Sequence, residues 1–166
     1  MEGERLSRIV QILEKLENQL DEKNIIKFSV DGEVYEKCCT FNAPADQENI
    51  KKFEKKHHTL PDDLKEFLCL HNGARIFEDI VFGNKVGGGL HVFSLEEIES
   101  ELSNDFFDQV DGIAIAALFE GCYLILNKEN PNLYLFEDGL EYRLLDVGFE
   151  TFLQKYIDSE GDAFWE

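Results

Sequence analysis

The sequence predicts a single α+β domain in which helices pack around an antiparallel or mixed sheet. Three observations lead to this fold class. The chain has 166 residues, of which 43% are hydrophobic, enough to bury one core without disulfide staples. Several segments place apolar residues at helical spacing, and short β-prone runs are joined by tight turns. No repeat, low-complexity tract or long linker divides the chain, so residues 1–166 are expected to form one unit.

The first third predicts a helix, a hairpin and a second helix. The first helix carries an apolar stripe made of Leu6, Ile9, Val10, Leu13, Leu16 and Leu20. Residues 25–30 and 33–41 are β-prone and flank Asp31-Gly32, a dipeptide that suits the positive φ angles of a two-residue hairpin turn. Asp46 is then expected to cap a helix that runs from residue 47 to about residue 58.

The stretch "LPDDLKEFLCLHNG", residues 60–73, predicts a third helix with defined ends. Pro61 suits the first turn, and Asp62 and Asp63 place negative charge at the positive end of the helix dipole. Leu64, Phe67, Leu68 and His71 follow the spacing of a buried face. Asn72-Gly73 is expected to end the helix, with Gly73 as a left-handed cap.

The remaining sequence is dominated by strand signals. Runs at 74–83 and 89–93 are apolar, and the glycine-rich segment 83–89 between them predicts a loop or bulge. Ser94 and Glu97 form a capping-box pattern that opens an acidic helix. Residues 112–119, 122–127, 133–138 and 140–145 predict a four-stranded antiparallel meander, followed by an aromatic closing helix and an acidic tail at 158–166.

Charge is the most informative compositional property. The formal net charge is −19, and residues 59–166 carry 23 acids against 6 bases. Such a field repels nucleic acid and anionic membranes and accelerates association with a basic partner, although acidity also serves solubility alone. Without a signal peptide or a long apolar run, and with four cysteines that suit packed reduced thiols, we expect a cytoplasmic protein.

The residues offer little for catalysis, metal or cofactor binding. The segment "GNKVGGG" lacks the Gly-Lys-Ser/Thr ending of a phosphate loop, and His57, His58, His71 and His91 show no metal-ligand spacing. No serine or cysteine lies in a nucleophile motif. We therefore expect no enzyme, no metal and no cofactor.

Residues 48–78, "ENIKKFEKKHHTLPDDLKEFLCLHNGARIFE", resemble the SUKH superfamily. That family's pattern is a helix with I-x-x-x-E spacing, Leu-Pro, a second helix and Asn-Gly. The positions that match it are Ile50, Glu54, Leu60, Pro61, Phe67, Leu68, Asn72 and Gly73. Weaker matches at 119–139 and 144–157, including Phe149, Phe152 and Leu153, extend the resemblance over most of residues 47–157. Ala74 and Asn127 depart from the family's usual glycine and aspartate, and residues 1–45 are not covered.

The resemblance implies an α+β fold and a binding function. Many bacterial members are immunity proteins that neutralise a cognate polymorphic toxin, often a nuclease, whereas fungal relatives regulate cell-wall synthesis and signalling. We expect an immunity protein that binds a basic toxin domain, and the alternative is a cellular regulatory or scaffold module with an endogenous partner. The predicted interface combines seven acids with two aromatic anchors: Glu96, Glu97, Glu99, Glu101, Asp105, Asp108 and Asp111, with Phe106 and Phe107. The oligomeric state is left open.

Overall fold

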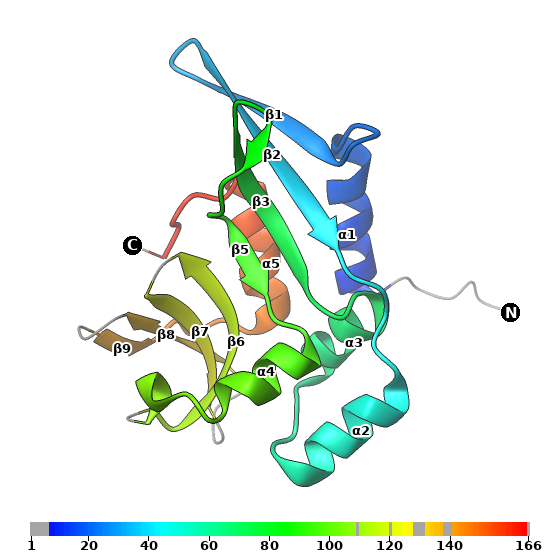
Figure 1. Ribbon diagram of the computed structural model, residues 1–166, viewed down its shortest axis with the longest axis vertical. Helices are drawn as coiled ribbons and strands as arrows, with labels where there is room; N and C mark the ends of the chain where they lie inside the picture. The colour runs from blue at the N-terminus through cyan, green and yellow to red at the C-terminus, as the bar shows by residue number, and fades with distance from the viewer. Residues whose placement is uncertain (1–6, 109, 120, 128–131, 138–140, 166) are drawn as a thin grey trace, which may run out of the picture.

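The computed structural model describes residues 7–108, 110–119, 121–127, 132–137 and 141–165. Within these ranges, nine strands form one antiparallel sheet in the order β1-β2-β3-β5-β6-β7-β8-β9, with β4 paired to β3 (Figure 1). The strands are β1 (Ile25–Val30), β2 (Glu33–Phe41), β3 (Ala74–Val81), β4 (Asn84–Lys85), β5 (Leu90–Val92), β6 (Gly112–Phe119), β7 (Cys122–Asn127), β8 (Leu133–Glu137) and β9 (Glu141–Leu144). This arrangement confirms the predicted α+β class, with antiparallel pairing throughout the described strands.

Five α-helices and one short 3₁₀ helix accompany this sheet in the described ranges. They are α1 (Arg8–Gln19), α2 (Gln47–Lys56), α3 (Asp62–Leu70), α4 (Leu95–Glu101), η1 (Asp105–Phe107) and α5 (Phe149–Asp158). In Figure 1, α1 and α5 lie behind the sheet, α2 and α3 lie at the lower end, and α4 crosses the front below β5. Contacts join α1 to α5 and α3, and α3 to α5, so these three helices close one side of the core.

The N-terminal elements follow the sequence closely. Asp31 and Gly32 have φ angles of 50° and 81° and join Val30 to Glu33, which confirms the predicted tight turn. Asp46 accepts a hydrogen bond of 2.8 Å from the backbone N–H of Glu48 and caps α2 as expected. On α1 the buried face differs slightly, because Ile12 is buried and Val10 is only half-buried.

Gly73 has a different role from the predicted helix cap. Helix α3 begins after Pro61 and ends at Leu70, so Gly73, with φ of 95°, lies beyond the helix. A Cβ atom there would lie 2.9 Å from the backbone nitrogen of Ser94. The glycine therefore permits the loop after α3 to approach the start of α4, and this close approach shapes the surface described below.

The predicted continuous strand at 74–83 is wrong at its end. Strand β3 stops at Val81, Phe82 and Gly83 form a turn with φ angles of 51° and 78°, and Asn84–Lys85 returns as β4. Part of the predicted loop at 83–89 is thus a short strand. The turn escaped prediction because a two-residue turn of this kind normally carries Asn, Asp or Gly at its first position, and here that residue is phenylalanine.

The C-terminal half confirms the predicted meander within the described residues. Strands β6 to β9 pair in sequence order, and the turn residues 120, 128–131 and 138–140 lie outside the described part of the chain. On α5, Phe149, Phe152 and Leu153 are buried as expected. The acidic tail also contributes apolar contacts, because the rings of Phe164 and Trp165 lie 5.1 and 5.5 Å from that of Phe152.

Candidate protein-binding surface

Helix α4 carries much of the predicted interface, and its first turn is fixed by side-chain hydrogen bonds. Ser94 accepts from the backbone N–H of Glu97 at 3.1 Å, and the Glu97 carboxylate accepts from the backbone N–H of Ser94 at 3.0 Å, so the predicted capping box is present. Asn72 adds a second cap from outside the helix: its Oδ1 accepts from the backbone N–H of Leu95 at 2.9 Å. Its Nδ2 donates to both carboxylate oxygens of Glu96, at 3.0 and 3.1 Å.

The predicted acids divide into exposed and engaged residues. Six of them lie along α4, η1 and the entry to β6 and remain exposed or half-exposed; we call these residues the acidic surface, namely Glu96, Glu99, Glu101, Asp105, Asp108 and Asp111. Glu97 is also half-exposed, but its carboxylate is held by the capping box and lies 3.0 Å from His91 Nε2, so we leave it out of this group. Glu97 stabilises the start of α4, and its role as a partner contact stays a prediction.

The remaining carboxylates differ in how firmly they are held. Glu99 lies 2.9 Å from Nε2 of His57, the residue that follows α2, and Glu101 accepts from Nδ2 of Asn104 at 2.9 Å. Asp105, Asp108 and Asp111 have no side-chain hydrogen bond or ion pair with other described residues. These three carboxylates can therefore receive a lysine or arginine without breaking an internal contact.

The two predicted aromatic anchors serve mainly to hold η1 on the sheet. Phe107 is 8% exposed, and its ring meets that of Tyr123 edge to face at 4.9 Å. The half-buried ring of Phe106 lies 5.4 Å from Tyr123 and 5.1 Å from Phe136. Phe107 thus belongs to the core and has almost no surface for a partner, whereas part of the Phe106 side chain stays accessible. Their packing fixes the acidic surface to strands β7 and β8.

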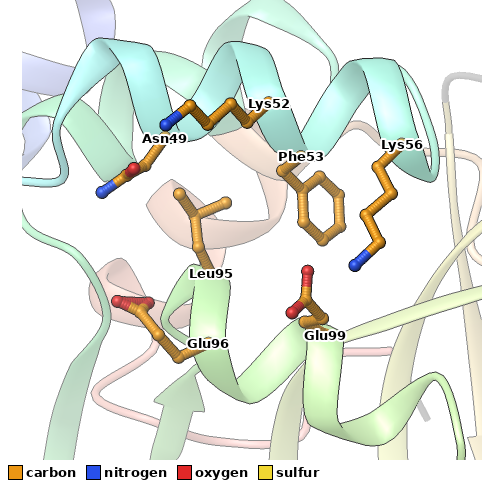
Figure 2. A pocket seen from close by; sticks show the side chains of 7 residues that line it. All are labelled: Asn49, Lys52, Phe53, Lys56, Leu95, Glu96 and Glu99. Carbon is orange, nitrogen blue, oxygen red and sulfur yellow. The ribbon is translucent and has the colours of Figure 1, made fainter.

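A groove that the sequence analysis missed borders the acidic surface. It has a volume of about 410 Å³ and lies between α2 and α4 (Figure 2). Lys52 and Lys56 line the α2 side and Glu96 and Glu99 the α4 side, while Phe53 lies between them. The lysines belong to a basic face of α2, and its members, all exposed, are Lys51, Lys52, Lys55 and Lys56. The acidic surface is therefore flanked by positive charge on one side.

The distribution of charge along the chain also separates the acidic surface from the basic face of α2. No lysine or arginine occurs from Val86 to Asn127, and this stretch of 42 residues contains eight acids. Because α4, η1 and the start of β6 lie within it, the acidic surface has no positive charge from its own segment. The positive charge nearby comes from α2, which is distant in sequence, and no local pattern could have located it.

Three further features of the described residues concern metal ligands, thiols and membrane spans. They contain no group of three or more histidine, cysteine, aspartate or glutamate residues that could hold a metal ion. Cys38, Cys39 and Cys122 are buried, Cys69 is half-buried, and all four are free thiols. Burial raises the pKa of Cys39 to about 11, so this thiol stays protonated and unreactive near neutral pH. None of the described helices has the length and apolar character that a membrane span requires.

Comparison with known proteins agrees with this fold and with the motif on α2 and α3. The SMI1 / KNR4 family (SUKH-1) matches residues 44–155. The chain is 46% identical over 161 residues to the uncharacterized protein YobM of Bacillus subtilis (strain 168), covering 91% of this chain and 87% of that protein. It is 31% identical over 138 residues to the uncharacterized protein YnaB of the same organism, covering 76% of this chain and 85% of that protein. The chain therefore belongs to the SMI1 / KNR4 family, SUKH-1.

Proposed function

We propose that this protein is a non-catalytic cytoplasmic immunity protein that binds a cognate basic toxin domain and covers its active site. The observation that carries the proposal is the exposed acidic surface on a segment without a single lysine or arginine. Family membership supports a protein-binding role, because many bacterial members of the SUKH superfamily act in this way. The acidic surface supplies a chemical basis for choosing a basic partner.

Electrostatic attraction would act first on the rate of encounter. A surface of one charge sign steers an oppositely charged protein toward it and raises the association rate by about 10-fold to 1000-fold at low salt. The unengaged carboxylates of Asp105, Asp108 and Asp111 are then free to pair with lysines or arginines of the toxin. A toxin domain that acts on nucleic acid must carry such residues, because it binds phosphates.

The surface is also held rigid before binding. The capping box and the Asn72 contacts fix the start of α4, and the packed rings of Phe106 and Phe107 fix η1. A preorganised surface loses less conformational entropy on binding, which favours tight complexes. The basic face of α2 beside it would orient the partner, since only one arrangement keeps the partner's basic residues over α4 and away from the lysines of α2.

The first experiment is affinity capture of the tagged protein from its host at low and moderate salt, followed by identification of the co-purified proteins. We expect a basic domain of a large secreted protein whose recovery falls with salt. Recovery of resident cytosolic proteins alone would contradict the toxin proposal and would favour a regulatory module.

Charge reversal then tests the surface itself with the captured domain. The site variant is Asp105→Lys/Asp108→Lys/Asp111→Lys, and the control Glu14→Lys/Glu22→Lys/Asp158→Lys reverses three exposed acids on α1, in the turn after it and at the end of α5. Both variants change the net charge from −19 to −13. We expect the site variant to lower the association rate constant about tenfold or more and the control to lower it far less. Equal effects of the two variants would show that overall charge, and not this surface, governs binding.

A further inference from the structure

Exposed apolar side chains gather at the end of the sheet opposite the acidic surface. There the β1–β2 hairpin projects beside the β3–β4 hairpin, and β2 pairs with β3 through Glu36 and Ile80 (Figure 1). Six of the nine large exposed hydrophobic residues in the described chain belong to these two hairpins. We call them the hairpin patch: Val30, Val34, Tyr35, Val81, Phe82 and Val86. Its members cover both faces of the hairpin ends, because the neighbours Val34 and Tyr35 on β2 point to opposite faces. Large exposed apolar groups that gather in one place mark interaction surfaces more often than singly scattered ones do.

Phe82 is the most unusual member of the hairpin patch. Its side chain is 98% exposed, and its φ angle of 51° lies in the left-handed region that favours glycine, asparagine and aspartate. It occupies the first position of the two-residue turn between Val81 and Asn84. Folding gains nothing from a bulky aromatic ring in a strained, fully solvated turn. A residue kept under such conditions points to a function outside the monomer.

The same patch contains a hollow that could receive this ring. A groove of about 520 Å³ lies between the two hairpins. Its apolar lining comes from Val34, Tyr35, Ile80, Val81, Val86 and Phe82 itself, and Glu36 and Asp79 add two carboxylates to its lining. A two-fold interface requires that one patch carry both the protruding group and its complement, because each copy presents the same surface. We propose that the hairpin patch is a self-association surface, through which two copies of this chain form a two-fold dimer with Phe82 of each copy in the groove of the other.

Charge distinguishes a second copy from a basic partner at this place. The two hairpins carry four bases and five acids, namely Lys27, Lys37, Arg75 and Lys85 with Asp31, Glu33, Glu36, Glu78 and Asp79. The patch is therefore within one charge of neutral in a chain of net charge −19. Two strongly acidic molecules can approach each other here with little local repulsion, and lysines of one copy can face acids of the other, as Lys37 and Asp79 do within one chain at 3.6 Å. A basic partner would find no comparable attraction.

The decisive variant is Phe82→Asn, measured by sedimentation velocity over about 1 to 200 μM protein, where a self-association equilibrium shifts with concentration. Asparagine suits the left-handed turn, so we expect the variant to keep or raise the thermal stability of the fold. Removing the ring should raise the dimer dissociation constant at least about tenfold, as truncating a central aromatic anchor does in other interfaces. The control is Leu102→Gln, which removes an exposed apolar side chain on the far side of the molecule. We expect the control to dimerise as the unmodified chain does.

Salt gives an independent readout of the partner's identity. Electrostatic repulsion between two chains that each carry a net charge of −19 weakens as the salt concentration rises. Self-association should therefore strengthen between about 50 and 500 mM NaCl, whereas binding of a basic toxin should weaken. A chain that stays monomeric at the highest protein and salt concentrations would overturn the inference. A dimer dissociation constant that is the same for Phe82→Asn and the unmodified chain would also overturn the inference. Capture of a basic protein by the unmodified chain, lost in Phe82→Asn, would overturn it as well. The inference does not depend on the proposed toxin partner.

Discussion

Asn72 is predicted to stabilise the acidic surface from a distance, and the variant Asn72→Ala tests this directly. Its side chain supplies an acceptor to the backbone N–H of Leu95 and donates to the carboxylate of Glu96. Loss of a helix cap costs about 0.5 to 2 kcal/mol. Loss of a partly exposed hydrogen bond to a carboxylate adds about 0.5 to 1 kcal/mol. We therefore expect the free energy of unfolding to fall by about 1 to 3 kcal/mol, measured by urea denaturation.

Asn104→Ala is the matched control for this prediction. Asn104 also accepts from a backbone N–H, that of Phe106 at 3.0 Å, and also donates to a glutamate, Glu101 at 2.9 Å. Its partners lie two and three residues away on an exposed segment, so it joins no separate parts of the fold. We expect its removal to cost about 1 kcal/mol or less. Hydrogen exchange should also show faster opening of the first turn of α4 in Asn72→Ala than in Asn104→Ala.

The double variant Asn72→Asp/Glu96→Gln separates the contact to Glu96 from general damage. Asn72→Asp keeps an acceptor for Leu95 but places a second carboxylate against Glu96, so it should destabilise the protein at pH 7. Glu96→Gln restores a donor at this contact and should recover most of the loss. If Asn72→Ala costs no more than Asn104→Ala, or if Glu96→Gln recovers nothing, then Asn72 does not hold α4 as the geometry indicates.

Three further predictions concern backbone, thiol and histidine chemistry. Gly73→Ala should lower the free energy of unfolding by about 2 kcal/mol or more in urea denaturation, because a φ of 95° and a contact of 2.9 Å with Ser94 both oppose a Cβ atom. In the native protein at pH 8, a thiol reagent should modify Cys69 first, since burial raises the pKa of Cys39 to about 11; rapid modification of Cys39 would contradict this. Burial lowers the pKa of His91 in the folded protein, despite the neighbouring carboxylate of Glu97. The His91 imidazole therefore binds a proton more readily in the unfolded chain than in the folded one. Protonation of His91 thus lowers the free energy of unfolding as the pH falls below about 6.5. His91→Gln should remove that part of the pH dependence in denaturation measured from pH 7 to pH 5, and an unchanged slope would count against it.

Where the signal was local, the sequence predicted the structure well. The Asp31-Gly32 turn and the capping box of Ser94 and Glu97 depend on residues within four positions of one another, and both are present. The buried face of α5 was also predictable, because helical spacing alone places its aromatic residues on one side. These features depend only on backbone preferences and on the spacing of apolar residues, and both can be derived from the sequence alone.

The features that shape the proposed interface could not be predicted in this way. The hydrogen bond from Leu95 to Asn72 spans 23 residues, and the groove joins α2 to α4 across more than 40 positions. The burial of Phe107 depends on Tyr123, which lies on a different element. Such contacts arise from tertiary packing, and no single-sequence pattern encodes which of two aromatic neighbours will face the core.

The two proposed surfaces lie at opposite ends of the molecule, and this separation has a consequence for stoichiometry. The hairpin patch lies at one end of the long axis in Figure 1, and α4 lies toward the other. A dimer formed through the hairpins would leave both acidic surfaces open and far from the two-fold axis. Each copy could then bind a toxin domain without hindering the other, so the complex should contain two copies of each protein. Phe82→Asn should convert it to a one-to-one complex with unchanged affinity per site, which multi-angle light scattering and calorimetry would resolve. A loss of toxin affinity in that variant would mean instead that the two surfaces are coupled.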